Sequence, residues 1–326
     1  AGQYLGERFT RLFIPLAVGV FTLVPIQVYI EKSAQFDSLL SFYPHMFEGV
    51  YPEGNFSWHH LWFIAYLFFI ALIIAPFLKF FRSGGFDLFL GKLAKLVAKR
   101  LGANIFIVPM ILSQLILRPY FPENTHGFID DWASMVYYII FFLSGFMLLS
   151  NKNMVESIRK QKHWFMAESV IGTIILFTLP YMMNSDKWGN MTWDLMEPFV
   201  AWSCGMTAIG YANQYLNKNS KLRKLANEAI YPFYLLHQPI IVVMAYFMVE
   251  WDISILWKVV SISISSFVLT IAIYWILIRP FNIMRVVFGM KWIKNVSPVS
   301  VSPDRLNPIP ILNKTQTDPS LNELLN

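Results

Sequence analysis

The residue best placed for chemistry is His237, which lies in the run YPFYLLHQP over residues 231–239. A neutral imidazole in such a setting can act as a general base or hydrogen-bond a sugar hydroxyl. Pro232 and Pro239 remove backbone donors from this run, so they leave carbonyl oxygens open to other partners. The alternative is structural, with His237 and Gln238 joining two helices by hydrogen bonds. The sequence leaves both interpretations open.

A second run, NFSWHHLWF over residues 55–63, contains His59 and His60. Adjacent side chains on a helix point about 100° apart, so these two imidazoles make a poor chelating pair, and no HExxH pattern follows. Because the chain also has only one cysteine, we expect no metal site and no internal disulfide. Trp58 and Trp62 fit an aromatic belt at the lipid interface, although an indole beside an imidazole also suits the face of a carbohydrate.

Arg8 and Arg11 form a third candidate site, with Pro15 about one turn further along. Their spacing of three residues puts both guanidinium groups on one face of a helix, which suits a diphosphate or a carboxylate. Arginines that anchor a helix by snorkelling give the same pattern. Neither a P-loop nor a dinucleotide-binding pattern occurs, so ATP hydrolysis and dinucleotide chemistry have no support.

The elements that must position these residues are membrane helices. Of the 326 residues, 56% are hydrophobic and 14% are charged, and the mean hydropathy is +0.48. A typical globular protein has about 25% charged residues. The net charge is +6, but the basic residues lie between apolar blocks and form no basic stripe, so we expect no nucleic-acid partner.

We expect an all-α, polytopic membrane helical bundle, because the apolar blocks have the length of about 20 residues that crosses a bilayer. Eight segments have this length, at roughly 10–30, 60–80, 102–121, 131–149, 164–184, 194–214, 229–249 and 255–278. If all eight cross, 22 Lys and Arg residues fall on one side and 4 on the other. Since positive residues near helix ends stay in the cytoplasm, both ends of this chain are predicted to be cytoplasmic.

The segments between the spans also carry signals. The outer connection at about 31–59 is aromatic, acidic and punctuated by Pro and Gly, so we expect an ordered lid. The inner connection at about 82–100 has apolar residues at helical spacing beside lysines, which predicts a helix at the inner membrane surface that meets anionic lipid or a bound phosphate. We expect the transmembrane domain to occupy residues 1–294, with a disordered cytoplasmic tail at 295–326.

Polar residues inside the spans need partners, because an ionisable group at membrane depth costs about 2.5–3.5 kcal/mol on insertion scales. Glu168 lies about one turn inside its span, and we expect it to pair with Lys162. Gln114, Arg118 and Glu197 lie toward the outer side, where we expect them to line a polar cavity.

Three motifs, taken in order, resemble the membrane acyltransferase family 3, with the nearest likeness to the bacterial glucan biosynthesis protein C group. They are RFTRL at 8–12 followed by Pro15, WHHLWF at 58–63, and YPFYLLHQP at 231–239. The resemblance covers about residues 5–290 and implies a complete fold of about ten helices, of which this chain would hold the last eight. The family's first helix carries a histidine considered catalytic, which has no counterpart here, so we expect the sequence to be N-terminally incomplete.

The resemblance also implies a function. A protein of this kind would be a multi-pass enzyme of the bacterial inner membrane that moves an acyl group, acetyl or succinyl, from cytoplasmic acyl-CoA to a glycan or other extracytoplasmic carbohydrate. Arg8 and Arg11 match the family's paired arginines and are predicted to bind the acyl-CoA donor. His60 and His237 match its recurrent histidines and are predicted to be catalytic. The expected partners are membrane lipid and the carbohydrate acceptor.

Two other classes of function also fit a bundle of membrane helices. A transporter or flippase for a polar lipid or glycan would move its substrate without consuming acyl-CoA. A sensor or assembly partner would have no turnover at all. Mass spectrometry of surface glycans separates them: loss of an O-acyl mass increment without the gene favours the enzyme, and unchanged but mislocalised glycan favours transport.

Overall fold

The structure, a computed structural model, describes residues 2–293 except 52, 123, 124, 126, 129, 183–185 and 219, and without the side chains of 180–182 and 186–191. The predicted tail at 295–326 therefore lies outside the described residues. Ala1–Trp292 forms one compact unit. Its described residues are mostly helical and include no strand, only an isolated bridge between Val50 and Phe56.

Five helical stretches of the described chain are long and apolar enough to cross a membrane. They are Gly2–Glu31, His59–Leu78, Trp132–Leu149, Lys221–Met248 and Ile255–Ile278. Each coincides with a predicted segment, so a multi-pass helical membrane protein is confirmed. The segment Gly102–Leu117 is apolar but shorter. The remaining two predicted segments fall in the long helices α9 (Lys152–Met182) and α10 (Asp186–Tyr211), which are less apolar.

The first stretch is not a uniform helix. It runs from α1 (Gly2–Arg8) through a π-helical turn (Phe9–Phe13) into α2 (Ile14–Thr22) and α3 (Val24–Glu31). Pro15 has no backbone N–H, so the carbonyl of Arg11 lacks its usual helical donor. The N–H of Ile14 bonds five residues back to the carbonyl of Phe9, which widens this turn. The wide turn falls on Arg11, one of the candidate site residues.

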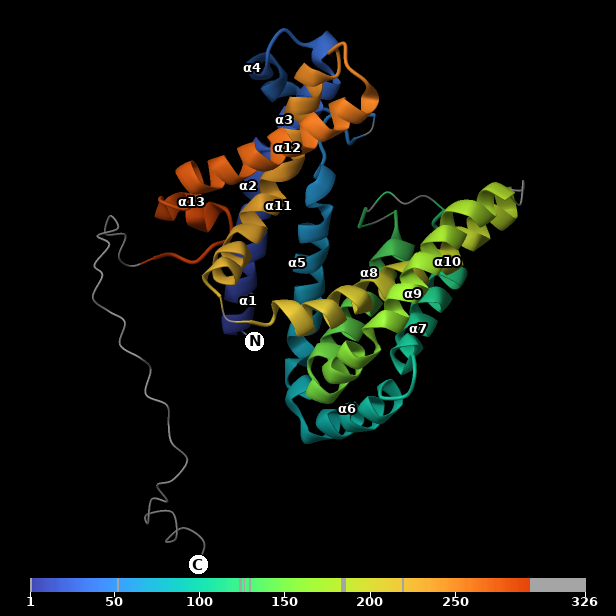
Figure 1. The fold of residues 1–326 in the computed structure, drawn as a ribbon. Coiled ribbons are helices and arrows are strands. Elements are labelled where there is room, and N and C mark those ends of the chain that lie inside the picture. Colours follow the sequence, from blue (N-terminus) through green and yellow to red (C-terminus); the bar gives the residue numbers. More distant parts are fainter. Residues whose placement is uncertain are drawn as a thin grey trace, which may run out of the picture. The chain divides into compact units, whose positions relative to one another are not determined.

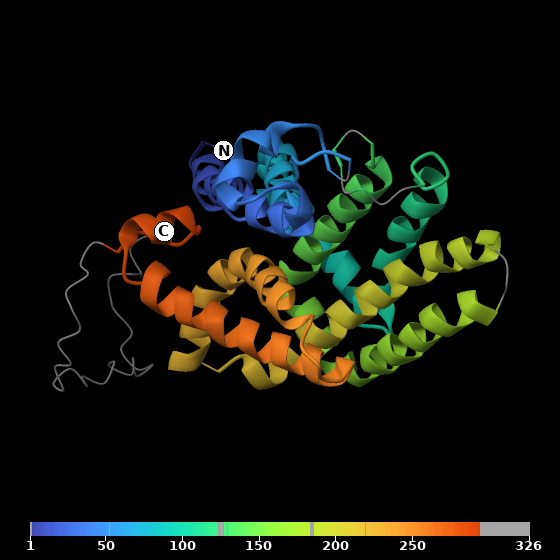
Figure 2. The ribbon, with the colours of Figure 1, turned by 90° about the horizontal axis from the view of Figure 1, so that it is seen from above.

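The helices pack around two main cores (Figure 1). In one core, Val28, Leu61 and Leu235 bring together α3, the start of α5 (Trp62–Ile74) and α11 (Lys221–Met248). A smaller cluster joins α11 to the π-helical turn Tyr274–Ile278, which continues α12 (Ile255–Ile273) and precedes α13 (Asn282–Val287). Figure 2 shows α11 and α12, coloured gold to orange, running side by side.

The other core lies among α6 (Gly84–Val97), α7 (Ile107–Leu117), α8 (Trp132–Leu149), α9 and α10. Its largest fully buried side chain is Trp202 of α10. Ser83 caps the start of α6 because its hydroxyl accepts from the N–H of Phe86, and the helix buries Phe86 and Leu90. Its lysines are exposed. The pattern of residues 82–100 therefore produces an amphipathic helix packed on this core.

The connection between α3 and α5 is folded and includes the short helix α4 (Leu39–Phe42). Phe42 is fully buried in the core. Lys32 donates hydrogen bonds to the carbonyl of Gly54 at 2.8 Å and to Asn55 Oδ1 at 2.7 Å, which ties the two ends of the connection together. At its edge, the Glu31 carboxylate raises the pKa of the Tyr51 phenol.

The close approach of α9 and α10 generates a test of the fold. A Cβ added to Gly210 would lie 2.7 Å from the Cβ of Lys162 and 3.1 Å from the carbonyl oxygen of Ile158. We expect Gly210→Ala to destabilise the protein by about 1–3 kcal/mol, because helix backbones cannot yield as a flexible side chain can. Gly205, on the same helix, has no heavy atom within 4 Å of an added Cβ, so Gly205→Ala is the matched control. Thermal unfolding in detergent measures both, and equal melting temperatures would contradict the close packing.

Candidate active site

A pocket of about 490 Å³ in the described structure opens between the N-terminal helix, α11 and the segment around α13. Its lining contains four basic residues and one acidic residue: Arg8, Arg11, Arg285, Lys291 and Glu228. Leu12, Asn227, Tyr231, Gly289 and Met290 complete the lining. The excess of positive charge makes the pocket suited to an anion.

Arg8 and Arg11 both line this pocket, as the spacing of three residues predicts for one helix face. Arg8 is half-buried and its guanidinium lies 5.0 Å from the centre of the Tyr4 ring, whereas Arg11 is exposed. Neither makes an ion pair within the described part of the chain. The Nε of Arg8 is enclosed there without a hydrogen-bond partner. Both charges are therefore available to a ligand.

Arg285 lines the same pocket, but it is buried and paired. It is 4% exposed, and its Nη1 lies 2.8 Å from Glu228 Oε1. Its Nε donates to the carbonyl of Lys291 at 3.0 Å. Sequence reasoning counted Arg285 and Lys291 only as loop charges and did not single out Glu228. Their position in the pocket depends on the packing of α11 against the segment after α12. No local sequence pattern predicts that packing.

His60 and His237 come together, although 177 positions separate them in the sequence. Their ring centres lie 5.6 Å apart at an interplanar angle of 88°. Pro239 has no N–H to offer the carbonyl of Leu235 four residues earlier, and His60 Nε2 donates to that carbonyl at 3.2 Å. The proline therefore opens the backbone acceptor that positions the histidine of another helix.

The hydrogen bonds fix which nitrogen of each ring is free. A carbonyl oxygen only accepts, so Nε2 of His60 carries the hydrogen and the lone pair of the neutral ring lies on Nδ1. Within the described residues, His60 Nδ1 is enclosed and has no partner. His237 Nδ1 donates to the carbonyl of Tyr234 at 2.6 Å, which leaves its lone pair on Nε2. The hydrogen bond of His237 stays inside α11, and the described contacts include none from His237 or Gln238 to another helix, so they do not support the structural alternative.

One helix connects the pocket to the histidines. Tyr231 lines the pocket, and His237 follows six residues later on α11, about 9 Å further along the axis. The hydroxyl of Tyr234 donates to the backbone carbonyl of His60, so α11 bonds both the backbone and the ring of His60. Leu235 is buried between them in the core. Neither histidine lines the pocket, so the paired imidazoles form a second part of the candidate site, about 9 Å from Tyr231 along α11.

The tryptophans around His60 do not form the simple lipid-facing belt of the first interpretation. Trp58 is half-buried, and its ring centre lies 5.1 Å from that of Phe128. Trp62 is also half-buried, with its ring 5.2 Å from Tyr138 of α8. These contacts show that the indoles pack inside the protein. Sequence position at the start of a span does not distinguish an inward-facing indole from an outward-facing one.

His59 has a different setting from His60. Its backbone φ of +38° lies in the left-handed region, which is unusual for a residue with a side chain. Its ring centre lies 4.8 Å from that of Tyr51 in the outer connection. Within the described residues, no group of three or more His, Cys, Asp or Glu side chains is arranged to hold a metal ion.

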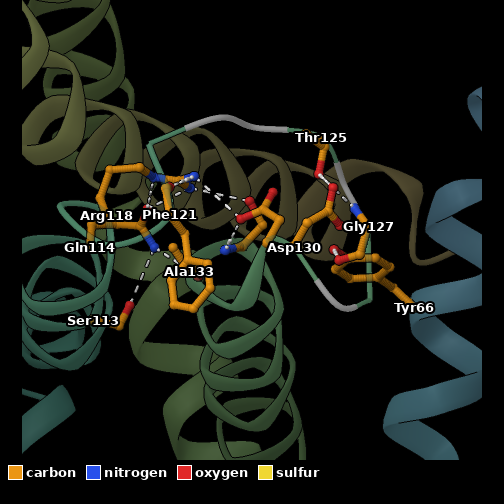
Figure 3. Close-up of polar contacts among 11 residues, drawn as sticks. Tyr66, Ser113, Gln114, Arg118, Phe121, Thr125, Gly127, Asp130 and Ala133 are labelled. Carbon is orange, nitrogen blue, oxygen red and sulfur yellow. Dashed lines mark hydrogen bonds and ion pairs between the residues drawn. The ribbon is translucent and has the colours of Figure 1, made fainter. Parts of the chain in front are cut away.

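A second polar network surrounds Arg118 at the end of α7 (Figure 3). Arg118 Nη1 lies 3.3 Å from Asp131 Oδ1, and Nη2 donates to Gln114 Oε1 at 2.9 Å. Gln114 in turn donates to the carbonyl of Ala133. Asp131, fully buried, is the partner that sequence reasoning missed. Gln114 and Arg118 thus belong to an internal network, whereas Glu197 is exposed.

The predicted pair of Glu168 with Lys162 is wrong. Glu168 Oε1 instead accepts a hydrogen bond from Asn104 Nδ2 at 2.8 Å. The Nζ of Lys162 lies 5.7 Å from the centre of the Tyr211 ring on α10. The two side chains are six residues apart on α9, so neighbouring helices provide nearer partners than the helix itself.

The ion pair of Arg118 generates a stability prediction. We expect Asp131→Asn to destabilise the protein by about 3–5 kcal/mol, because it removes the buried carboxylate that pairs with the largely buried guanidinium of Arg118. Asparagine can still cap α8 by accepting from the N–H of Ser134, so the loss reports the charge and not the cap.

The control is Glu156→Gln on α9. The exposed pair of Glu156 and Arg159 lies at 2.5 Å, and the hydrogen bond from Arg159 lowers the pKa of Glu156. Solvent screens this pair, so we expect little change in thermal unfolding. If Glu156→Gln lowered the stability as much as Asp131→Asn, burial would not be what determines how much an ion pair stabilises this protein.

Comparison with known proteins identifies the family. A family model described as an acyltransferase domain matches residues 1–279. No curated protein and no solved structure gives a significant match to the chain. The chain therefore belongs to the acyltransferase family 3, and the family predicted from the three motifs is confirmed. It is a membrane acyltransferase enzyme.

Proposed function

We propose that this acyltransferase transfers an acetyl or succinyl group from cytoplasmic acyl-CoA to a glycan or other extracytoplasmic carbohydrate, in the bacterial inner membrane. The observation that carries the proposal is the position of Arg8 and Arg11, which face an anion pocket about 9 Å along α11 from two paired histidines. A transporter gains no support from the family match.

The pocket supports binding of the phosphate end of the donor. Arg8 and Arg11 have no carboxylate partner in the described chain, and guanidinium groups bind phosphate through pairs of charge-assisted hydrogen bonds. Two enclosed donors at the pocket lining, Arg8 Nε and the hydroxyl of Tyr231, also lack partners among the described residues. No metal is required for this recognition.

The paired histidines support the chemical step. A sugar hydroxyl that attacks the thioester carbon forms a C–O bond, the C–S bond breaks, and the thiolate leaves as coenzyme A. A base must take the hydroxyl proton, which then passes to the departing thiolate. His60 Nδ1 and His237 Nε2 carry the free lone pairs for this role. The buried Leu61 and Leu235 beside them keep the site dry, which strengthens the electrostatic interactions that stabilise the developing oxyanion.

We further propose that all eight predicted segments cross the membrane and that both ends of the chain are cytoplasmic. The 31 residues of α9 extend about 46 Å, more than the roughly 30 Å of the hydrocarbon layer. Its outward residues include exposed Val170, Ile174 and Phe177, as a lipid-facing surface requires. In this topology the four basic residues of the pocket lie at the cytoplasmic face, beside the source of acyl-CoA. Membrane lipid would contact α6.

The proposal predicts how site variants change the kinetics. We expect Arg8→Gln and Arg11→Gln each to raise the KM for acyl-CoA by about 10- to 100-fold, because each removes a charged hydrogen bond to the donor. We expect His60→Ala and His237→Ala to lower kcat by about 10²–10⁴-fold, because each removes a base. The measurements are release of coenzyme A from donor and acceptor in isolated membranes, and the acyl content of surface glycans by mass spectrometry.

Arg159→Gln is the matched control, since Arg159 is paired with Glu156 and lies outside the pocket. Kinetics like those of the wild type in all four site variants would contradict the assignment of the site. Surface glycans with unchanged acyl content in cells without the gene would contradict the carbohydrate acceptor.

A further inference from the structure

The segment 288–291 forms one wall of the anion pocket. Gly289, Met290 and Lys291 all belong to the lining. Gly289 has a φ of +70°, which favours glycine, and it packs against both sides of the pocket. A Cβ at this position would lie 2.2 Å from Tyr231 Cε1 and 2.9 Å from the carbonyl oxygen of Arg11. The wall therefore closes on the same helix turn that presents Arg11.

Arg285 holds this wall in place. Its guanidinium joins Glu228 of α11 at 2.8 Å to the carbonyl of Lys291 at 3.0 Å. Nη1 also reaches the carbonyl of Arg279 at 3.3 Å, and the N–H of Met290 donates to the carbonyl of Arg285 at 2.7 Å. Two of its three nitrogens, Nε and Nη1, are thus bonded inside the protein, whereas Arg8 and Arg11 make no ion pair within the described residues.

Arg279 provides an internal comparison, because it shares the same carboxylate. Its Nε lies 3.9 Å from Glu228 Oε2, and its side chain is 37% exposed, against 5% for Arg285. Its guanidinium lies 4.3 Å from the centre of the Trp275 ring. Arg279 does not line the pocket. The two arginines therefore have the same charge and the same partner, and only Arg285 reaches the wall.

We propose that Arg285 is a positioning residue that fixes the segment 288–291 against α11 and so sets the affinity of the pocket for its anionic ligand. The identity of that ligand as acyl-CoA rests on the proposed function. The position of the wall does not, so the two can be tested separately.

The first experiment follows the wall without any ligand. In a Cys204→Ser background, which removes the exposed natural cysteine, Met290→Cys supplies one thiol on the half-buried wall. We expect Arg285→Gln to raise the rate of labelling by a water-soluble maleimide roughly tenfold or more, because a charged buried hydrogen bond no longer opposes local opening. Arg279→Gln should leave the rate unchanged. Equal rates in the Arg285→Gln and parent proteins would overturn the proposal.

The second experiment uses the full chain in detergent or nanodiscs with coenzyme A as the probe. We expect Arg285→Gln to weaken coenzyme A binding, and to raise the KM for acetyl-CoA, by about tenfold or more, with a much smaller change in kcat. Arg285→Lys should not restore binding, because an ammonium group lacks the fork that spans the carboxylate and the carbonyl. Full restoration by lysine, with unchanged labelling of the wall, would mean that Arg285 binds the phosphates directly.

A third variant, at the partner of Arg285, keeps the proposal testable if Arg285→Gln does not fold. Glu228→Gln keeps a hydrogen-bonding side chain and removes the charge, so it should move the labelling rate and the affinity in the same direction by smaller factors. Labelling that responds to Arg285→Gln in a protein that does not bind coenzyme A would overturn the proposed function and leave the positioning role standing. Labelling that does not respond to Arg285→Gln, in a protein that binds coenzyme A, would overturn the positioning role and leave the proposed function standing.

Discussion

A backbone constraint underlies the whole site: inside a membrane there is no water to bond a carbonyl that has lost its helical donor. Pro239 creates such a carbonyl at Leu235, and the imidazole of His60 satisfies it. Pro15 likewise leaves the carbonyl of Arg11 without its helical donor, and the helix widens there into a π-helical turn. That carbonyl lies close to Gly289, only 2.9 Å from where a Cβ would be. Both prolines thus mark places where a distant segment approaches the helix backbone.

The distribution of charge around the pocket follows a second rule. A buried cation needs a partner, whereas a cation at the mouth of a pocket can keep its bonding capacity for a ligand. Arg285 is buried and pairs with Glu228, whereas Arg8 and Arg11 lie at the pocket without a carboxylate partner among the described residues. The same rule applies to Arg118, whose carboxylate partner Asp131 is fully buried. Pairing, more than residue type, separates the arginines that support the structure from those open to chemistry.

Much of the fold is readable from the sequence because hydropathy and length act locally. The apolar stretches from His59 and from Ile255 were predictable in this way, and so was the helix at 84–97. The three motifs also gave the family. What could not be predicted are contacts between segments far apart, such as Arg285 with Glu228 or Glu168 with Asn104. These depend on how helices pack, and a sequence pattern within one helix, such as Lys162 near Glu168, suggests the wrong neighbour.

The six-residue interval between Tyr231 and His237 on α11 has a consequence for selectivity in the proposed reaction. If the donor is acyl-CoA, as proposed, the chain of atoms between its phosphates and its thioester is the same whatever acyl group it bears. An anion pocket and a pair of histidines on one helix would then recognise the part that all such donors share. The choice of acyl group would fall to the side chains beyond the histidines.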